Sequence, residues 1–175
     1  MASILPAERE KIDWDEPREY PQRAKTVLAA DPPQGLAEMA LDGTFIASWI
    51  LGDLVVLDRT LRKLLSRDDT KVVAVAFEDQ LVSLNGKNPF RKADQKKAIH
   101  AEGVILAAAG TFGVDVQRIS ARAAKYALTD DASASKGAVK KAVLEKYGHK
   151  AKTQHEADAI AVGHELLKRL RKGAR

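Results

Sequence analysis

Short apolar runs alternate with longer amphipathic stretches from about residue 25 to the end of this chain. Short runs that stop at prolines, acids or glycines are typical of β-strands, and they occupy residues 25–30, 71–77 and 115–119. Residues 38–51 carry Asp42-Gly43 between two further apolar runs, which predicts a β-hairpin. The first three strands are therefore expected to form an antiparallel meander.

Helical periodicity predicts helices in the remaining segments, which are residues 58–67, 92–109, 133–147 and 153–170. Asp58 is expected to cap the first helix, and Gly148 is expected to end the third. A meander followed by alternating helices and strands predicts an α/β fold, with a mixed five-stranded sheet flanked by helices on both faces.

The last predicted helix carries polar groups on its buried face. Val162, Leu166 and Leu170 form an apolar stripe at helical spacing, and the same stripe extended backwards meets Asp158 and His155. A charged group on a core-facing row is costly unless it is paired or binds a metal. This row therefore indicates a functional site.

The charge of the chain is unevenly distributed. The net charge is +5 at 175 residues, but residues 1–20 carry six acids and three bases, which leaves 26 bases against 18 acids in the remainder. A basic body favours an anionic partner such as nucleic acid, and the alternative is that the charge serves only solubility. Aromatic residues make up 5% of the chain, so backbone contacts are favoured over base stacking.

Other features of the composition restrict the class of protein. The chain has no cysteine, so disulfides and thiolate metal sites are excluded, and no apolar run approaches the length of a membrane span. Residues 1–24 contain Pro6, Pro17 and Pro21 and are expected to form a partly ordered extension that precedes one domain, residues 25–175. The start of the sequence does not resemble a signal peptide, so a cytoplasmic location is expected.

Two acids end apolar strands and would join the row on the last helix. Asp31 follows the first strand and Glu78 follows the most apolar one, so the two could converge with His155 and Asp158. Carboxylates with one imidazole favour Mg²⁺ or Mn²⁺, and two such ions are the recurrent solution for phosphodiester cleavage. Each residue also has a structural alternative, as a turn residue, a strand-end acid or a helix-start residue.

Several neighbouring polar residues have simpler interpretations. Thr153 and Glu156 form a capping box, which explains Glu156 better than metal ligation does. His100, His149 and His164 have no companion at ligand spacing and are interpreted as structural or surface residues. A basic run is expected to contact phosphates or to form a solvated face; it comprises Lys125, Lys136, Lys140, Lys141, Lys146, Lys150 and Lys152.

The chain resembles the RuvC family of Holliday junction resolvases, within the ribonuclease H-like superfamily, over about residues 25–172. The first family motif is an apolar strand ending in Asp, here VLAADPP with Asp31. The second is an apolar strand ending in Glu, here VVAVAFEDQ with Glu78. The third is HEADAIA, with His155 and Asp158 three residues apart.

Further segments match the family in the same order. HAEGV resembles its Gln-Ala-Arg-Gly segment, while AKYAL and ASKGAV resemble its two lysine segments, with Lys125 and Lys136 at the family's spacing. Asn85 lies where the family tends to have Asn. The family often has an aromatic wedge residue where this chain has Leu81, and Phe90 is a candidate substitute.

The resemblance implies a structure-selective endonuclease that resolves Holliday junctions and other branched DNA. It implies a homodimer packed through the helix at about 92–109, two Mg²⁺ or Mn²⁺ ions per active site, and symmetric nicks that leave 5′-phosphate and 3′-hydroxyl ends. The implied metal ligands are Asp31, Glu78, His155 and Asp158, with Lys136 as a further catalytic residue. The implied DNA contacts are Lys125, Lys136, Lys140, Asn85, Phe90 and Leu81.

Three alternatives remain open on the sequence. One is a related nuclease that acts on forks, flaps or structured RNA. Another is a non-catalytic nucleic-acid-binding module of the same fold. The third is an enzyme for small phosphorylated metabolites, against which the lack of a glycine-rich phosphate loop counts. A phage-encoded member of the family, located in the host cytoplasm, would also be consistent with the departures from the family motifs.

Overall fold

The computed structural model describes residues 24–32, 34–79 and 89–173, and of residues 89–95 the backbone alone. Its sheet consists of β1 (Ala24–Asp31), β2 (Gly35–Ala40), β3 (Phe45–Ile50), β4 (Thr70–Asp79) and β5 (Asp115–Ser120). Its helices are α1 (Leu54–Leu65), α2 (Pro89–Thr111), α3 (Ala121–Thr129), α4 (Lys136–Tyr147) and α5 (Gln154–Gly173). The expected extension, residues 1–24, lies outside these ranges except for Ala24.

The strands lie in the order β3-β2-β1-β4-β5. β1, β2 and β3 pair antiparallel, as the meander predicted, and β4 and β5 run parallel to β1 and to each other. β1 is thus the central strand, and its carboxyl end lies beside that of β4. The mixed five-stranded sheet inferred from the sequence is confirmed.

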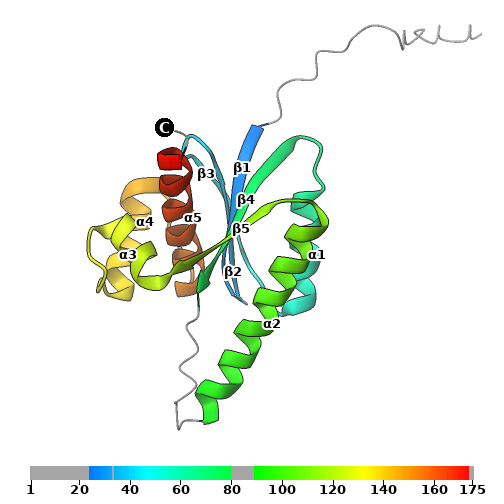
Figure 1. The fold of residues 1–175 in the computed structure, drawn as a ribbon. Helices are drawn as coiled ribbons and strands as arrows, with labels where there is room; N and C mark the ends of the chain where they lie inside the picture. The colour runs from blue at the N-terminus through cyan, green and yellow to red at the C-terminus, as the bar shows by residue number, and fades with distance from the viewer. Residues whose placement is uncertain (1–23, 33, 80–88, 174–175) are drawn as a thin grey trace, which may run out of the picture.

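Helices cover both faces of the sheet (Figure 1). α3, α4 and α5 cover one face, where Val27, Ala29 and Ala76 pack against them, and α1 and α2 cover the other, where Leu28 and Phe77 are buried. Alternate residues of β1 and β4 belong to different cores because strand side chains alternate between faces. The continuous apolar run at residues 72–77 is explained by burial on both sides.

Three helix starts differ from the prediction, and one helix was missed. α2 begins at Pro89 rather than at about residue 92. α1 begins after Asp53, whose Oδ1 accepts the Val56 N–H at 2.9 Å, whereas Asp58 lies within the helix and pairs with Arg62. α4 begins at Lys136 after the cap Ser135, rather than at residue 133. α3 was not predicted; it starts with no loop after β5 and is only nine residues long, so its periodicity is brief.

α5 packs closely over β1 and β2. A Cβ at Gly163 would lie 2.6 Å from Met39 Sδ and 3.2 Å from the Ala29 Cβ, so the absence of a side chain permits this approach. The apolar stripe is buried as expected at Val162 and Leu166 and half-buried at Leu170. None of the helices in the described ranges combines the length and the apolarity that a membrane crossing requires.

His164 joins α5 to the end of α4. Its Nδ1 lies 2.5 Å from Tyr147 Oη, and its Nε2 lies 3.2 Å from Lys146 Nζ. Burial, with added repulsion from Lys146 and Lys168, lowers the pKa of His164 to about 4. The ring is therefore held neutral by the fold, in agreement with the structural role expected for it.

The first prediction concerns the pH dependence of stability. Between pH 6.5 and 4 the unfolded chain binds a proton at residue 164 that the folded chain does not, so this residue makes the free energy of unfolding fall as pH falls. One pKa unit corresponds to about 1.4 kcal/mol, and since the ring is only partly buried we expect a loss of about 1–2 kcal/mol across this window. His164→Gln should remove that loss in urea unfolding at pH 7 and pH 4.5.

The control is His100→Gln, which alters an exposed histidine on α2. It should keep the wild-type difference between the two pH values. An unchanged difference in His164→Gln would contradict the assignment of this acid sensitivity to His164.

Candidate active site

Four polar side chains meet where the carboxyl ends of β1 and β4 lie beneath the start of α5. Ala30 of β1 is paired with Phe77 of β4, so the next residues, Asp31 and Glu78, end the two strands side by side. In each strand the acid lies an even number of positions from residues that face α5. Because side chains alternate between the two faces of a sheet, both acids project towards that helix. The sheet order thus brings together two acids that lie 47 positions apart in the sequence.

The start of α5 contacts Asp31 directly and also carries the third acid, Asp158. His155 Nδ1 lies 2.7 Å from Asp31 Oδ2, and Gln154 Nε2 donates to Asp158 Oδ1 at 2.7 Å. Asp31 is only 4% exposed, so this imidazole is its main polar partner. Glu78 has no hydrogen-bond partner within the described ranges.

The three carboxyl groups are held in an environment that disfavours their charged forms. Burial raises the pKa of Asp31 to about 6, although the hydrogen bond from His155 opposes the rise. Burial raises the pKa of Glu78 to about 8, with a further contribution from the charges of Asp31 and Asp158. Burial also raises the pKa of Asp158 against the hydrogen bond from Gln154. The charge of Asp158 adds to the raised pKa values of both Asp31 and Glu78, which indicates that the three acids lie close together.

Two lysines lie close enough to offset part of this repulsion. Lys125 of α3 lowers the pKa of Glu78 and Asp158, and Lys136, the first residue of α4, lowers the pKa of Asp31 and Asp158. The structure therefore places both sequence-predicted lysines at the acidic cluster. They reach it from two different helices, one of which the sequence analysis had not found.

Glu156 holds the start of α5 rather than joining the cluster. Its Oε2 accepts the Thr153 N–H at 3.4 Å, and its own N–H donates to Thr153 Oγ1 at 3.1 Å, which is the expected capping box. The same Oε2 also accepts the Lys152 N–H at 2.5 Å. Its Oε1 accepts from Ser48 Oγ at 2.5 Å and lies 2.8 Å from His149 Nε2. Burial alone would raise the pKa of Glu156, but these hydrogen bonds outweigh it and hold the pKa below its usual value.

Gly35 sets how closely α5 approaches the strand ends. Gly35 is paired with Asp31 in the sheet, and a Cβ there would lie 2.2 Å from the carbonyl oxygen of His155. Any larger residue must displace the first turn of α5. Sequence analysis missed both this glycine and Gln154, because the contacts that give them a role join distant segments; the same holds for the bond from Ser48 to Glu156.

The donor atoms of the acidic cluster, which are carboxyl oxygens and one imidazole nitrogen, are of the kind that binds a hard divalent cation. Within the described ranges, no three histidine or acidic side chains converge tightly enough to enclose an ion. The set nevertheless combines three carboxyl groups with one imidazole, and Glu78 accepts no hydrogen bond from any residue that the structure describes. Mg²⁺ and Mn²⁺ prefer oxygen donors of this type.

Of the remaining predicted DNA contacts, the structure describes some and not others. Leu81, Asn85 and the side chain of Phe90 lie outside the described residues. Lys140 lies one turn beyond Lys136 on α4, with its Nζ 3.5 Å from the carbonyl oxygen of Lys152. Lys146, from the same basic run, lies at His164 in the middle of α5.

The fold is of the ribonuclease H-like class. No family model and no curated protein matches the sequence. Among solved structures, the chain is similar to RuvC of Thermus thermophilus at 22% identity and a TM-score of 0.67, covering 85% of this chain and 96% of that one. It is also similar to T. thermophilus RuvC in complex with Holliday junction substrate, at 21% identity and a TM-score of 0.70, covering 86% and 96%. The chain therefore has the RuvC fold.

The second prediction tests the close approach of α5. Gly35→Ala should lower the free energy of unfolding by about 1–3 kcal/mol, because the added methyl group overpacks a site that has no room for it. It should also shift the ring resonances of His155, which lies at the point of the clash. Urea unfolding and histidine NMR provide the two measurements.

Gly52→Ala is the matched control, because a Cβ at Gly52 meets nothing within 4 Å. It should leave both stability and the His155 resonances near their wild-type values. Equal behaviour of the two alanine variants would show that Gly35 does not position α5.

Proposed function

We propose that this protein is a metal-dependent endonuclease that resolves four-way DNA junctions. The observation that carries the proposal is the acidic cluster at the ends of β1 and β4 under α5, with raised pKa values and two flanking lysines. The RuvC fold adds support, since one similar structure is a RuvC bound to a Holliday junction substrate.

Asp31, Glu78 and Asp158 would hold the divalent ions, with His155 as a ligand or as a group that orients water. Bound ions supply a nucleophile from water at neutral pH and stabilise the leaving oxygen of an in-line displacement. Asp31 fixes the orientation of the His155 ring through Nδ1, which leaves Nε2 as the ring atom for ligation or for a water proton.

Lys125 and Lys136 would contact the phosphates that flank the scissile bond. Both already interact with the acidic cluster, so a phosphate placed over the acids lies within their field. Lys140, one turn further along α4, extends this positive edge. Contacts of this type position the DNA backbone and carry little sequence information.

α2 supplies a surface suited to a homodimer. Ile99 and Leu106 are 49% and 42% exposed, and they recur two turns apart with exposed Gly103 and Gly110 on the same stripe. Such a seam of apolar and small residues permits close helix pairing. A two-fold dimer would place two sites for symmetric nicks in opposite strands, each leaving a 5′-phosphate and a 3′-hydroxyl.

The third prediction tests the acids directly. Asp31→Asn and Glu78→Gln should each reduce cleavage of a synthetic four-way junction in Mg²⁺ by at least about 100-fold, the scale of losing one preorganised electrostatic group. Binding of the junction should persist, because the lysines are intact. Asp115→Asn and Glu145→Gln, which alter exposed acids elsewhere, are the controls and should cleave normally.

The same variants give a readout independent of activity. Glu78→Gln should raise the melting temperature in EDTA, because it removes one of three repelling carboxyl groups, at about 2–4 °C per kcal/mol for a chain of this size. Mn²⁺ should stabilise the wild type and not the variant. Full cleavage by both variants would refute the proposed roles of the acids.

The fourth prediction concerns assembly. Leu106→Glu should convert a dimer into a monomer in light scattering, because a charge would be buried in the α2 seam. Val55→Glu is the matched control, since Val55 is 65% exposed on α1. A wild type that is monomeric at micromolar concentration would contradict the dimer.

Comparing substrates separates the nearest rival functions. A preference for forks, flaps or RNA hairpins over the four-way junction would assign the site to a related nuclease. Absence of Mn²⁺ binding by calorimetry, with DNA binding retained, would assign the chain to the non-catalytic modules of this fold.

A further inference from the structure

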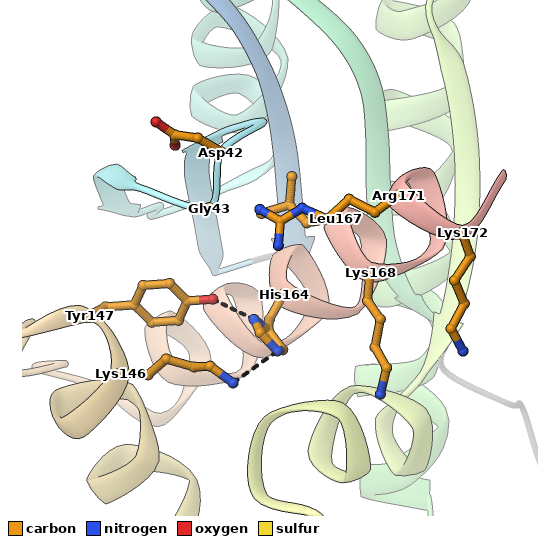
Figure 2. Close-up of a pocket in the computed structure, with 9 residues that line it drawn as sticks. All are labelled: Asp42, Gly43, Lys146, Tyr147, His164, Leu167, Lys168, Arg171 and Lys172. Carbon is orange, nitrogen blue, oxygen red and sulfur yellow. Dashed lines mark hydrogen bonds between the residues drawn. The ribbon is translucent and has the colours of Figure 1, made fainter. Parts of the chain in front are cut away.

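A second polar site lies far from the acidic cluster, at the C-terminal end of α5. It is a pocket of about 510 Å³ between α5, the end of α4 and the β2–β3 turn (Figure 2). Since a helix rises about 1.5 Å per residue, Lys168 of this pocket lies about 20 Å along α5 from His155. The pocket is therefore separate from the proposed catalytic site.

The charges that line this pocket are unbalanced. Lys146, Lys168, Arg171 and Lys172 face one acid, Asp42, whose carboxylate points away from them in Figure 2 and accepts the Thr44 N–H at 2.7 Å. None of the four cations lies within ion-pair distance of a carboxylate in the part of the chain that the structure describes. An anionic occupant would relieve this repulsion.

The present partners of these cations are neutral groups. Arg171 Nη2 donates to the carbonyl oxygen of Leu41 at 3.0 Å, and Lys146 Nζ lies 3.2 Å from the His164 ring. Lys168 Nζ lies 5.8 Å from the centre of the Tyr126 ring. Such contacts hold the side chains in place but bring no carboxylate into ion-pair distance, and among the four cations only Arg171 favours the charged form of Asp42.

The shape of the site suits an extended chain better than a compact anion. An adjoining hollow of about 410 Å³ shares Asp42, Gly43, Lys146 and Tyr147 with the pocket and continues to Phe45. Tyr147, Phe45 and Leu167 give the combined groove an apolar floor, and the cations form its rim. We call it the basic groove; its features match a peptide that combines carboxylates with an aromatic residue.

The chain itself carries such a peptide next to the groove. The carbonyl oxygen of Lys25 in β1 accepts the N–H of Leu41, which adjoins Asp42 at the rim, so the polypeptide enters the sheet beside the groove. The residues before β1 carry the surplus of acids noted above and include Asp13-Trp14-Asp15-Glu16. Glu19 precedes Ala24 by five residues, and a tether this short gives an effective concentration of about 1 mM or more.

We propose that residues 8–19 of each chain occupy the basic groove of the same chain. Trp14 packs on the apolar floor, and the neighbouring carboxylates pair with Lys168 and Lys172 on the rim. Occupation neutralises the positive charge at the C-terminal end of α5.

The test uses the full chain and its lack of cysteine. A nitroxide is attached to Ile12→Cys, and the amide resonances of Gly43 and Leu167 report its proximity by loss of intensity. At low salt both amides should lose more than half of their intensity, while amides of α1, on the other face of the sheet, keep theirs. About 0.5 M salt should restore the signals, because it screens exposed charges.

Charge reversal gives the specific control. Lys168→Glu/Lys172→Glu should abolish the intensity loss, and adding Asp13→Lys/Asp15→Lys to that variant should restore it. Arg59→Glu/Lys63→Glu makes the same change in net charge at exposed positions on α1 and should leave the loss unchanged. Survival of the loss in Lys168→Glu/Lys172→Glu would overturn the proposal.

Two further outcomes would assign the groove to another occupant. In a mixture, one set of chains carries the nitroxide and the other carries only the NMR isotope. Intensity loss in the isotope-labelled chains of this mixture would place the segment in a second copy. Junction binding that weakens in Lys168→Glu/Lys172→Glu but not in Arg59→Glu/Lys63→Glu, with no intensity loss in the wild type, would assign the groove to DNA. Each result contradicts occupation within one chain.

Discussion

The contact between a buried carboxylate and the first turn of the last helix organises this protein. Asp31 ends the central strand, is 4% exposed, and meets His155 at 2.7 Å. Three separate features make this contact geometrically possible: Gly35 gives α5 room, Gly163 lets α5 lie close on β1 and β2, and the Glu156 capping box fixes where α5 begins. The remaining site residues then take their places around it.

Without a bound cation, the charged forms of the acidic cluster destabilise the folded chain. Raised pKa values at Asp31 and Glu78 mean that the fold binds protons more tightly than the unfolded chain, so deprotonation of these groups costs stability. Packing elsewhere must offset this cost, because nearby Lys125 and Lys136 do so only in part. An arrangement of this kind is typical of sites that bind cations, where ligand binding returns the lost free energy.

Much of the fold could be predicted from the sequence because its signals are local. The strands at residues 25–30 and 71–77, the Asp42-Gly43 turn and the capping box at Thr153 were each recognisable within a few residues. The errors have local causes too. Asp53 and Asp58 both resemble caps, and the structure distinguishes them because Asp53 accepts the Val56 N–H, whereas Asp58 pairs with Arg62 within the helix. The nine residues of α3 are too few for a clear helical period.

The sequence by itself determined which residues stand at strand ends and on the inward face of α5, since periods of two and of 3.6 are written into neighbouring positions. Only the tertiary structure decided that Asp31 faces His155 and that Gly35 must be small. It also decided that the lysines divide between the acidic cluster and the far end of α5. These relations depend on strand order and helix docking, which join segments that are distant in the sequence, and no local pattern encodes them.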